Sequence, residues 1–306
     1  MWFHLFGFLA GSNGEGMRWE GQRESGNVED RRGMGPARVR GVGGLGLGGI
    51  VLVLAVSYFT GINPVTLLNM LNGVQEITDS SAPSESSEPA PIGAPSDQLG
   101  KFASVVLADT ETTWRQLLGP RYEDPRLVLF TGAVQSACGT TSSAVGPFYC
   151  PRDHKVYLDL SFFNEMSQRL GAPGDFAQAY VIAHEVGHHV QNLMGIAEKV
   201  TRLQRQASER ERNALSVRME LQADCFAGVW GHHAKRERNL IEPGDFEEGL
   251  RAASAIGDDQ LQKMSRGAVR PESWTHGSSE QRMTWLRKGL ETGDPKACDT
   301  FGSTRL

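Results

Sequence analysis

Apolar residues follow helical spacing through a central stretch of the chain that also carries two histidines. Pro173-Gly174-Asp175 breaks the preceding segment and offers a capping side chain, and Gly195 is suited to end a helix. Between them, apolar residues recur every three or four positions, at Phe176, Ala179, Tyr180, Ala183, Gly187, Val190 and Met194. The pattern predicts a helix that packs one face into a core, with His184 and His188 in its middle.

A second buried helix is predicted from about residue 212 to 234, where proline is absent and good helix formers dominate. Its apolar residues occupy most faces, which indicates burial. Glu220 and Asp224 lie four residues apart on this helix and therefore share one face. Because a buried pair of carboxylates is costly without a partner, this pair predicts a cation nearby.

The rest of the folded part is predicted to contain further helices and a small set of strands. The expected elements are helices at 98–118, after Asp245 and at 279–290, a strand at 127–130, and a hairpin formed by 146–150 and 155–160. Ser278 and Gln281 form a capping box for the last helix. A small sheet or hairpin beside several helices predicts the α+β class, mainly helical.

The N-terminal third predicts a membrane anchor. No charged residue occurs from Gly41 through Gln75, and this stretch is long and apolar enough to cross a bilayer. Several arginines precede it, and the positive-inside rule then places the N-terminus in the cytoplasm. We therefore expect one transmembrane helix at 41–63 in the inner membrane, with residues 1–40 in the cytoplasm and the remainder in the periplasm.

The alternatives to an anchor are a cleaved signal peptide and a buried core helix. The leader is long and no small-residue cleavage site follows the apolar stretch, which favours the anchor. Residues 64–96 have the Ser- and Pro-rich composition of a disordered linker, so the folded domain is expected at 97–306. Residues 1–16 differ from the rest and are either a start assigned too early, with Met17 as the natural start, or a disordered extension.

Charge and cysteine content narrow the class of protein. The net charge is −5 and the basic residues are scattered after the linker, which argues against nucleic acid as a partner. Four cysteines fit an oxidising compartment. We predict the pairs Cys138–Cys150 and Cys225–Cys298, which is one of three possible connectivities. Zinc bound by cysteine is disfavoured because no C-x-x-C spacing occurs.

The predicted central helix carries the sequence His184-Glu185-Val186-Gly187-His188, an H-E-x-x-H pattern. On a helix the two histidines share a face and can bind one metal ion, while Glu185 can reach a water bound to that ion. Catalytic zinc needs a third protein ligand, and Glu220 is our candidate because the intervening chain is long enough to return antiparallel. Asp224 would accept a hydrogen bond from a ligand histidine. Two nitrogens and one oxygen favour Zn²⁺.

The residues 184–191, HEVGHHVQ, and 220–230, ELQADCFAGVW, resemble the bacterial neutral zinc metallopeptidases, membrane-anchored relatives of the zinc proteases whose third ligand is Glu. The resemblance runs from residue 17 to the end of the chain. It includes Gly146–Pro151, Val156–Asp159 and Cys298–Phe301. It implies a zincin-like domain that hydrolyses a peptide or protein substrate, with Glu185 as general base.

More distantly, the helix pair is similar to the membrane heat-shock and prenyl-protein-processing zinc peptidases. Those enzymes carry a His shortly before a helix and an Arg six residues later, and His276 and Arg282 fit this spacing, although Gly277 stands where Pro is frequent. The resemblance implies that His276 stabilises the oxyanion, that Arg282 orients the peptide, and that an edge strand pairs with the substrate. The predicted hairpin is the candidate for that strand.

Two other classes of function stay open. One is a zinc-stabilised module that binds partners without catalysis, although a purely structural site would not need Glu185. The other is an amidase-type zinc hydrolase that acts on a small substrate, which a closed pocket would favour. The sequence indicates no oligomeric state.

Overall fold

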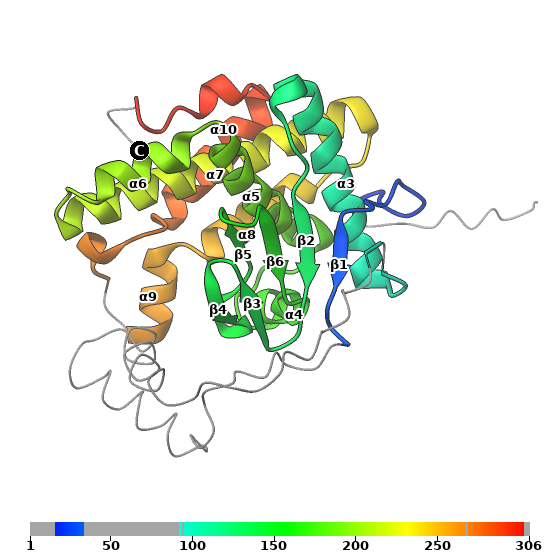
Figure 1. Cartoon of the computed structure of the whole chain (residues 1–306), viewed down its shortest axis with the longest axis horizontal. Helices are drawn as coiled ribbons and strands as arrows, with labels where there is room; N and C mark the ends of the chain where they lie inside the picture. The colour runs from blue at the N-terminus through cyan, green and yellow to red at the C-terminus, as the bar shows by residue number, and fades with distance from the viewer. Residues whose placement is uncertain (1–15, 34–91, 94, 267–268, 303–306) are drawn as a thin grey trace, which may run out of the picture. The chain divides into compact units, whose positions relative to one another are not determined.

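The computed structural model describes residues 16–33, 92–93, 95–266 and 269–302. The fold is α+β and mostly helical, as predicted, with helices packed against a small sheet (Figure 1). The helices are α3 (Gln98–Leu118), α4 (Ser161–Gln168), α5 (Asp175–Leu193), α6 (Ile196–Gln204), α7 (Glu209–Arg238), α8 (Asp245–Ala255), α9 (Asp258–Arg266) and α10 (Ser279–Thr292). The strands are β1 (Val28–Asp30), β2 (Arg126–Leu129), β3 (Ala133–Ser136), β4 (Gly139–Ser142), β5 (Phe148–Cys150) and β6 (Lys155–Leu158).

Four of these strands form one sheet in the order β1-β2-β6-β5. β2 pairs in parallel with β1 and with β6, while β5 and β6 form the predicted antiparallel hairpin. Side chains alternate along β2, so Leu127 and Leu129 join the main core with the helices, and Val128 joins a smaller core on the opposite face. Within the described sheet, β5 lies at the edge.

The predicted helix boundaries agree with the structure where capping residues or glycines mark the helix ends. α3 spans the predicted range, and Ser278 and Gln281 form the capping box of α10. Gly195 adopts a left-handed φ of 72° directly after α5, which a glycine tolerates at no cost. The helices α6 and α9 and the β3–β4 hairpin were not predicted; each is short, and the two helices contain few apolar residues.

The N-terminal segment corrects the predicted domain boundaries. Residues 17–33 are part of the folded domain rather than a separate cytoplasmic segment, since β1 pairs with β2. Trp19 packs edge-on against Phe102 of α3. Buried Glu111 on α3 also accepts hydrogen bonds from Arg23 and Asn27. The domain therefore includes a strand that precedes the predicted anchor.

This pairing bears on the predicted membrane topology. A single crossing between residues 33 and 92 would place β1 and β2 on opposite sides of a bilayer, where they could not pair. The predicted single-pass orientation therefore does not fit the sheet. The transmembrane helix expected at 41–63 and most of the linker at 64–96 lie outside the described residues. In the part that the structure describes, no helix is both long and apolar enough to traverse a membrane.

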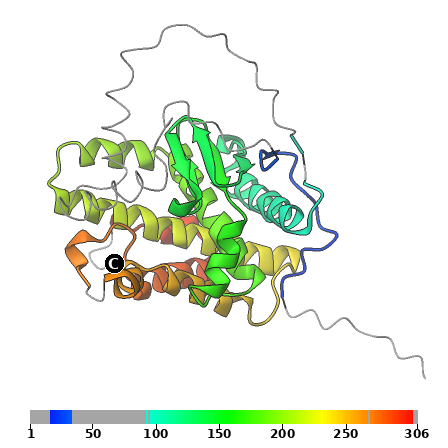
Figure 2. The same ribbon diagram turned by 90° about the horizontal axis from the view of Figure 1, so that it is seen from below.

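Both predicted disulfides are present. Cys138–Cys150 ties the β3–β4 hairpin to β5, and Cys225–Cys298 ties α7 to the segment after α10. α7 and α10 also approach closely through glycine: a Cβ on Gly289 would lie 2.0 Å from the Cys225 carbonyl oxygen. α7 also packs against α5. The turned view shows α10, in red, running beside α7, in yellow (Figure 2).

Candidate metal centre

The helices α5 and α7 bring three predicted ligands together. His184 Nε2 lies 3.2 Å from one carboxylate oxygen of Glu220, and His188 Nε2 lies 3.5 Å from the other. One ligand atom from each of the three residues lies within 4.8 Å of the others. This is the convergence that the sequence predicted from H-E-x-x-H and from a glutamate on the next long helix.

A glycine between the two histidines allows this convergence. A Cβ built on Gly187 would lie 3.0 Å from the backbone oxygen of Ala223, so the two helix backbones touch at this point. A side chain at position 187 would press on α7 and shift its backbone at Ala223, close to Glu220. Gly187 on α5 and the small Ala223 on α7 therefore allow the two helices to come close enough for Glu220 to reach the histidines.

A buried network behind the ligands orients His184. Asp224 accepts a hydrogen bond from His184 Nδ1 at 2.8 Å, which leaves Nε2 free to bind a metal. The same carboxylate accepts from the Tyr180 hydroxyl at 2.6 Å and from Arg282 Nε at 2.8 Å. The predicted role of Asp224 thus agrees with its position, and Tyr180 is a participant that the sequence did not single out.

A different residue orients His188. Gln191 Oε1 lies 2.9 Å from His188 Nδ1, and the Gln191 amide donates to the backbone oxygen of Met219 at 2.7 Å. The carbonyl end of this amide therefore accepts the Nδ1 proton, which again leaves Nε2 free. Sequence reasoning missed Gln191, although its position three residues after His188 on the same helix face was a usable signal.

The electrostatics of the centre favour a cation. Burial lowers the pKa of His184, but Asp224 and Glu220 outweigh this effect and raise it to about 10. Burial raises the pKa of Glu220, but His188 and His184 bring it well below its usual range. Ionised carboxylates thus face both imidazoles, and a divalent cation would satisfy the same oxygens without protons on the histidines. Two imidazole nitrogens and one carboxylate oxygen form a set that zinc accepts.

Glu185 lies beside the ligands and is 8% exposed. Among the described residues, no hydrogen bond engages its carboxylate, although buried carboxylates are usually paired. A carboxylate that is shielded, uncommitted and next to a metal-binding histidine is placed to exchange a proton with water at the centre.

Comparison with known proteins agrees with this geometry. Residues 17–301 match the family described as "Putative neutral zinc metallopeptidase". The chain belongs to this family. It is 49% identical over 299 residues to "Uncharacterized protein YpfJ" of Escherichia coli K12, covering 94% of this chain and all of that protein. It is 44% identical over 206 residues to "Uncharacterized protein Rv2575" of Mycobacterium tuberculosis H37Rv, covering 64% of this chain and 68% of that protein. No solved structure gives a significant match.

In this zinc metallopeptidase family member, His276 lies on a loop held against α7. The loop packs closely, since a Cβ on Gly277 would lie 3.2 Å from Leu221 Cδ2, one residue after Glu220. Gly277 has a φ of 96°, which proline cannot adopt, so this loop conformation excludes a proline at position 277. The His276 side chain is half exposed.

Asp258 fixes this loop and was not predicted. Its carboxylate accepts hydrogen bonds from the backbone nitrogens of Thr275, His276 and Gly277 at 2.8, 2.7 and 3.0 Å. It also lies 3.2 Å from His276 Nδ1, which leaves the other ring nitrogen for contacts outside the loop. Asp258 is the first residue of α9, which was not among the helices predicted from the sequence.

The position of Arg282 corrects its expected role. Only 3% of this residue is exposed, and its guanidinium pairs with Asp224 and donates to the Tyr180 hydroxyl at 3.2 Å. A side chain buried in this way does not contact a peptide lying at the surface. Its observed contacts make Arg282 a positioning residue that neutralises Asp224 behind His184.

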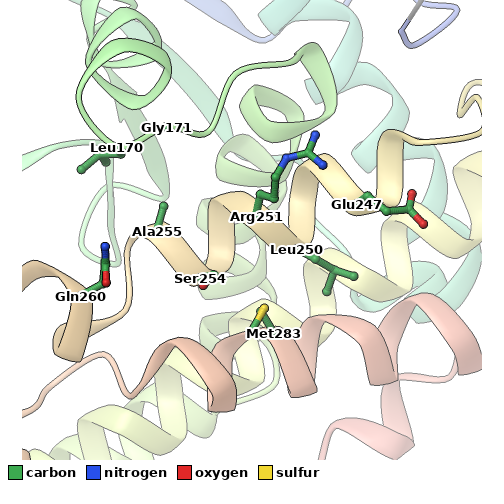
Figure 3. A pocket seen from close by; sticks show the side chains of 9 residues that line it. All are labelled: Leu170, Gly171, Glu247, Leu250, Arg251, Ser254, Ala255, Gln260 and Met283. Carbon is green, nitrogen blue, oxygen red and sulfur yellow. The ribbon is translucent and has the colours of Figure 1, made fainter.

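A separate hollow lies on another part of the molecule. It has a volume of about 520 Å³, and α8 contributes most of its lining, including Leu250 and Arg251, with Met283 from α10 and Leu170 from the loop before α5 (Figure 3). None of its lining residues belongs to the metal centre, so this hollow is not part of the candidate site.

Proposed function

We propose that this protein is a zinc-dependent metallopeptidase that hydrolyses peptide bonds, with Glu185 as the general base. The observation that carries this proposal is the convergence of His184, His188 and Glu220 beside an uncommitted carboxylate. A purely structural zinc site would need a fourth protein ligand and no base. Three ligands with Glu185 alongside instead leave one coordination position open for chemistry.

The residues of the chain divide the work between them. A zinc ion held by the three ligands would supply a Lewis acid that polarises a carbonyl and acidifies water. Glu185 accepts a proton from the attacking water and returns it to the leaving amine. His276 lies on the loop beside Glu220 and is the candidate donor to the developing oxyanion, held in place by Asp258.

The edge strand β5 supports a peptide as the substrate. β5 pairs with β6 on one side, and its other edge is free of described strands. It lies against the metal-binding helix, because the Tyr149 hydroxyl is 3.0 Å from His189 Nδ1 and accepts from Asn192 at 3.1 Å. An extended peptide that added to this edge would run alongside α5.

The disulfides support an extracytoplasmic compartment for this domain. Two cystines, one of them deep in the core, support a domain that folds in an oxidising environment outside the cytoplasm. The proposed substrate is therefore an extracytoplasmic peptide or protein.

The decisive experiment is Glu185→Gln in the full chain. We expect the variant to keep its zinc and its melting temperature, and to hydrolyse an unfolded test protein about 100- to 10,000-fold more slowly, because only the base is lost. Glu209→Gln, at the exposed start of α7, is the matched control and should behave as the wild type.

Two outcomes would contradict the proposal. Unchanged turnover by Glu185→Gln would remove this residue from the mechanism. A wild-type protein that binds zinc tightly but cleaves neither unfolded proteins nor small amides would instead be the non-catalytic binding module.

A further inference from the structure

Three carboxylates cluster where the helices α5 and α8 begin. Asp175 comes from α5, and Asp245 and Glu248 come from α8, with one oxygen of each within 4.8 Å of the others. Asp245 is only 2% exposed. Like charges gathered at a partly buried site repel one another unless a cation is present. The cluster is separate from the metal centre and has no part in the proposed hydrolysis.

The backbone nitrogen of Met17 reaches into this cluster. It donates to Asp175 Oδ2 at 2.8 Å. The Met17 side chain is 6% exposed and belongs to the main hydrophobic core, and the next residue, Arg18, donates its backbone N–H to the Leu240 carbonyl at 2.8 Å. The contacts of Met17 and of the residue after it therefore hold the nitrogen in position against the carboxylates.

Two other backbone N–H groups also donate to the cluster, from Phe176 to Glu248 at 3.3 Å and from Glu242 to Asp245 at 2.7 Å, but all three donors are uncharged. Asp175 Oδ1 is buried and has no hydrogen-bond partner among the described residues. Burial raises the pKa of Asp245 to about 6, and the charges of Asp175 and Glu248 add to this effect. Burial likewise raises the pKa of Asp175 and of Glu248. The site therefore keeps one buried acceptor, Asp175 Oδ1, without a donor, and it carries negative charge that the three amide groups do not neutralise.

We propose that the cluster of Asp175, Asp245 and Glu248 is a binding site for a free α-ammonium group on Met17, which is the N-terminal residue of the working protein. An α-ammonium carries a positive charge and three N–H donors, whereas a backbone amide has no charge and one N–H donor. It would occupy the position that the Met17 nitrogen already holds. The family match begins at residue 17, which agrees with this assignment.

The surroundings leave the ammonium as the natural counter-ion. Glu242 pairs with Arg18, and Arg251 on α8 lowers the pKa of Glu248. Glu242 also adds negative charge beside Asp245 and raises its pKa. A bound N-terminus would fasten the start of the chain to α5 and α8, and thereby help to seat β1 in the sheet.

The first test identifies the N-terminus of the protein made in its own host. Amine-directed labelling of the denatured protein followed by mass spectrometry should find a free α-amine on Met17. The same amine should resist labelling in the folded protein. A chain that begins at another residue, or a blocked amine at Met17, would overturn the proposal.

The second test uses thermal unfolding as a function of pH. An unfolded α-amine has a pKa of about 8, and the carboxylates raise it in the folded state. The stabilisation is therefore complete below about pH 8 and is lost as the pH rises through the higher folded value. Asp175→Asn should lower the melting temperature by about 5 °C at pH 7. Above about pH 9 the melting temperatures of the variant and the wild type should move closer together.

Two further variants keep the test decisive. If Asp175→Asn does not fold, Glu248→Gln replaces it, and the same pH dependence of the melting temperature is expected. Glu247→Gln is the control: Glu247 is exposed on the same helix, so this variant should match the wild type at every pH. A constant deficit across the whole pH range would contradict the proposal. Calcium that raises the melting temperature of the wild type but not of Asp175→Asn would show that the cluster binds a metal ion instead.

Discussion

At the scale of single residues, Asp224 has the largest share in organising the metal centre. Its two oxygens accept from a ligand histidine, a buried tyrosine and a buried arginine. The charges of Arg282 and His184 outweigh burial and hold its pKa well below the usual range. One carboxylate thus sets the tautomer of His184 and neutralises a guanidinium that is almost completely buried.

We expect Asp224→Asn to damage both stability and metal binding. The change leaves the Arg282 charge uncompensated, so the free energy of unfolding should fall by about 3 kcal/mol. It also weakens the hold on His184, so zinc affinity should fall about 10- to 100-fold. Chemical denaturation and competition with a zinc chelator would measure the two effects.

Tyr180→Phe is the matched control, because it removes one hydrogen bond to the same carboxylate and keeps both charges. It should cost about 1 kcal/mol and leave zinc affinity almost unchanged. Equal zinc affinity in Asp224→Asn and the wild type would show that His184 is oriented by its packing alone.

At the scale of elements, the loop before α10 depends on a side chain from α9. Asp258 accepts three consecutive backbone N–H groups and faces the His276 ring. If His276 stabilises the oxyanion, Asp258→Asn should lower kcat about 10-fold with little change in KM, because His276 acts on the transition state. In a His276→Ala background the same substitution should have no further effect on kcat. An equal loss in both backgrounds would assign Asp258 a purely structural role.

The strand β1 is anchored by one buried carboxylate. Glu29 accepts hydrogen bonds from Lys155 on β6, Arg31 and Arg126 at 2.8, 2.6 and 3.0 Å. Burial raises its pKa, but these cations outweigh that effect and bring it to about 2. Three strands of the sheet are thereby tied together.

We expect Glu29→Gln to lower the free energy of unfolding by about 2 kcal/mol at pH 7. A carboxylate with a lowered folded pKa contributes stability that is complete above its unfolded pKa and is lost as the pH falls. The deficit should therefore shrink between about pH 4.5 and pH 2. Urea unfolding over that range measures it, with the exposed Glu24→Gln as control. A deficit that persists at pH 2 would show that the carboxylate charge is not its source.

At the scale of the whole molecule, the two disulfides act differently. Cys225–Cys298 closes a long loop between two buried residues, whereas Cys138 is exposed and pairs over a sequence separation of 12. Replacing the first pair with serine should cost about 4 kcal/mol, and replacing the second about 3 kcal/mol. Mild reduction followed by thiol labelling should modify Cys138 and Cys150 first. Earlier labelling of Cys225 would contradict the buried position of that cystine.

The sheet also constrains how the chain meets a membrane. β1 and β2 flank the uncharged stretch from Gly41 to Gln75, and they pair with each other. The segments before and after that stretch therefore belong to one folded domain. Because they share a sheet, these two segments must lie on the same side of any bilayer.

The sequence alone determined the features that local chemistry controls. The spacing of His184 and His188, the capping box of α10 and the range of α3 follow from periodicity and end signals that neighbouring residues supply. The third candidate ligand, Glu220, could also be predicted from the sequence, because a buried helix with carboxylates at positions 220 and 224 implies a cation. The cysteine pairing was predicted correctly from where each cysteine falls among the expected elements.

Only the tertiary structure decided which distant segments meet. β1 is three residues long and carries two acids, so no local pattern marks it as a strand; it exists because β2 offers an unpaired edge and the cations beside Glu29 neutralise its charge. Arg282 fits a substrate-binding spacing in sequence, yet the fold turns it toward Asp224, because a carboxylate buried this deeply is costly without a paired cation. Local spacing fixes which residues share a face, whereas packing decides what that face meets.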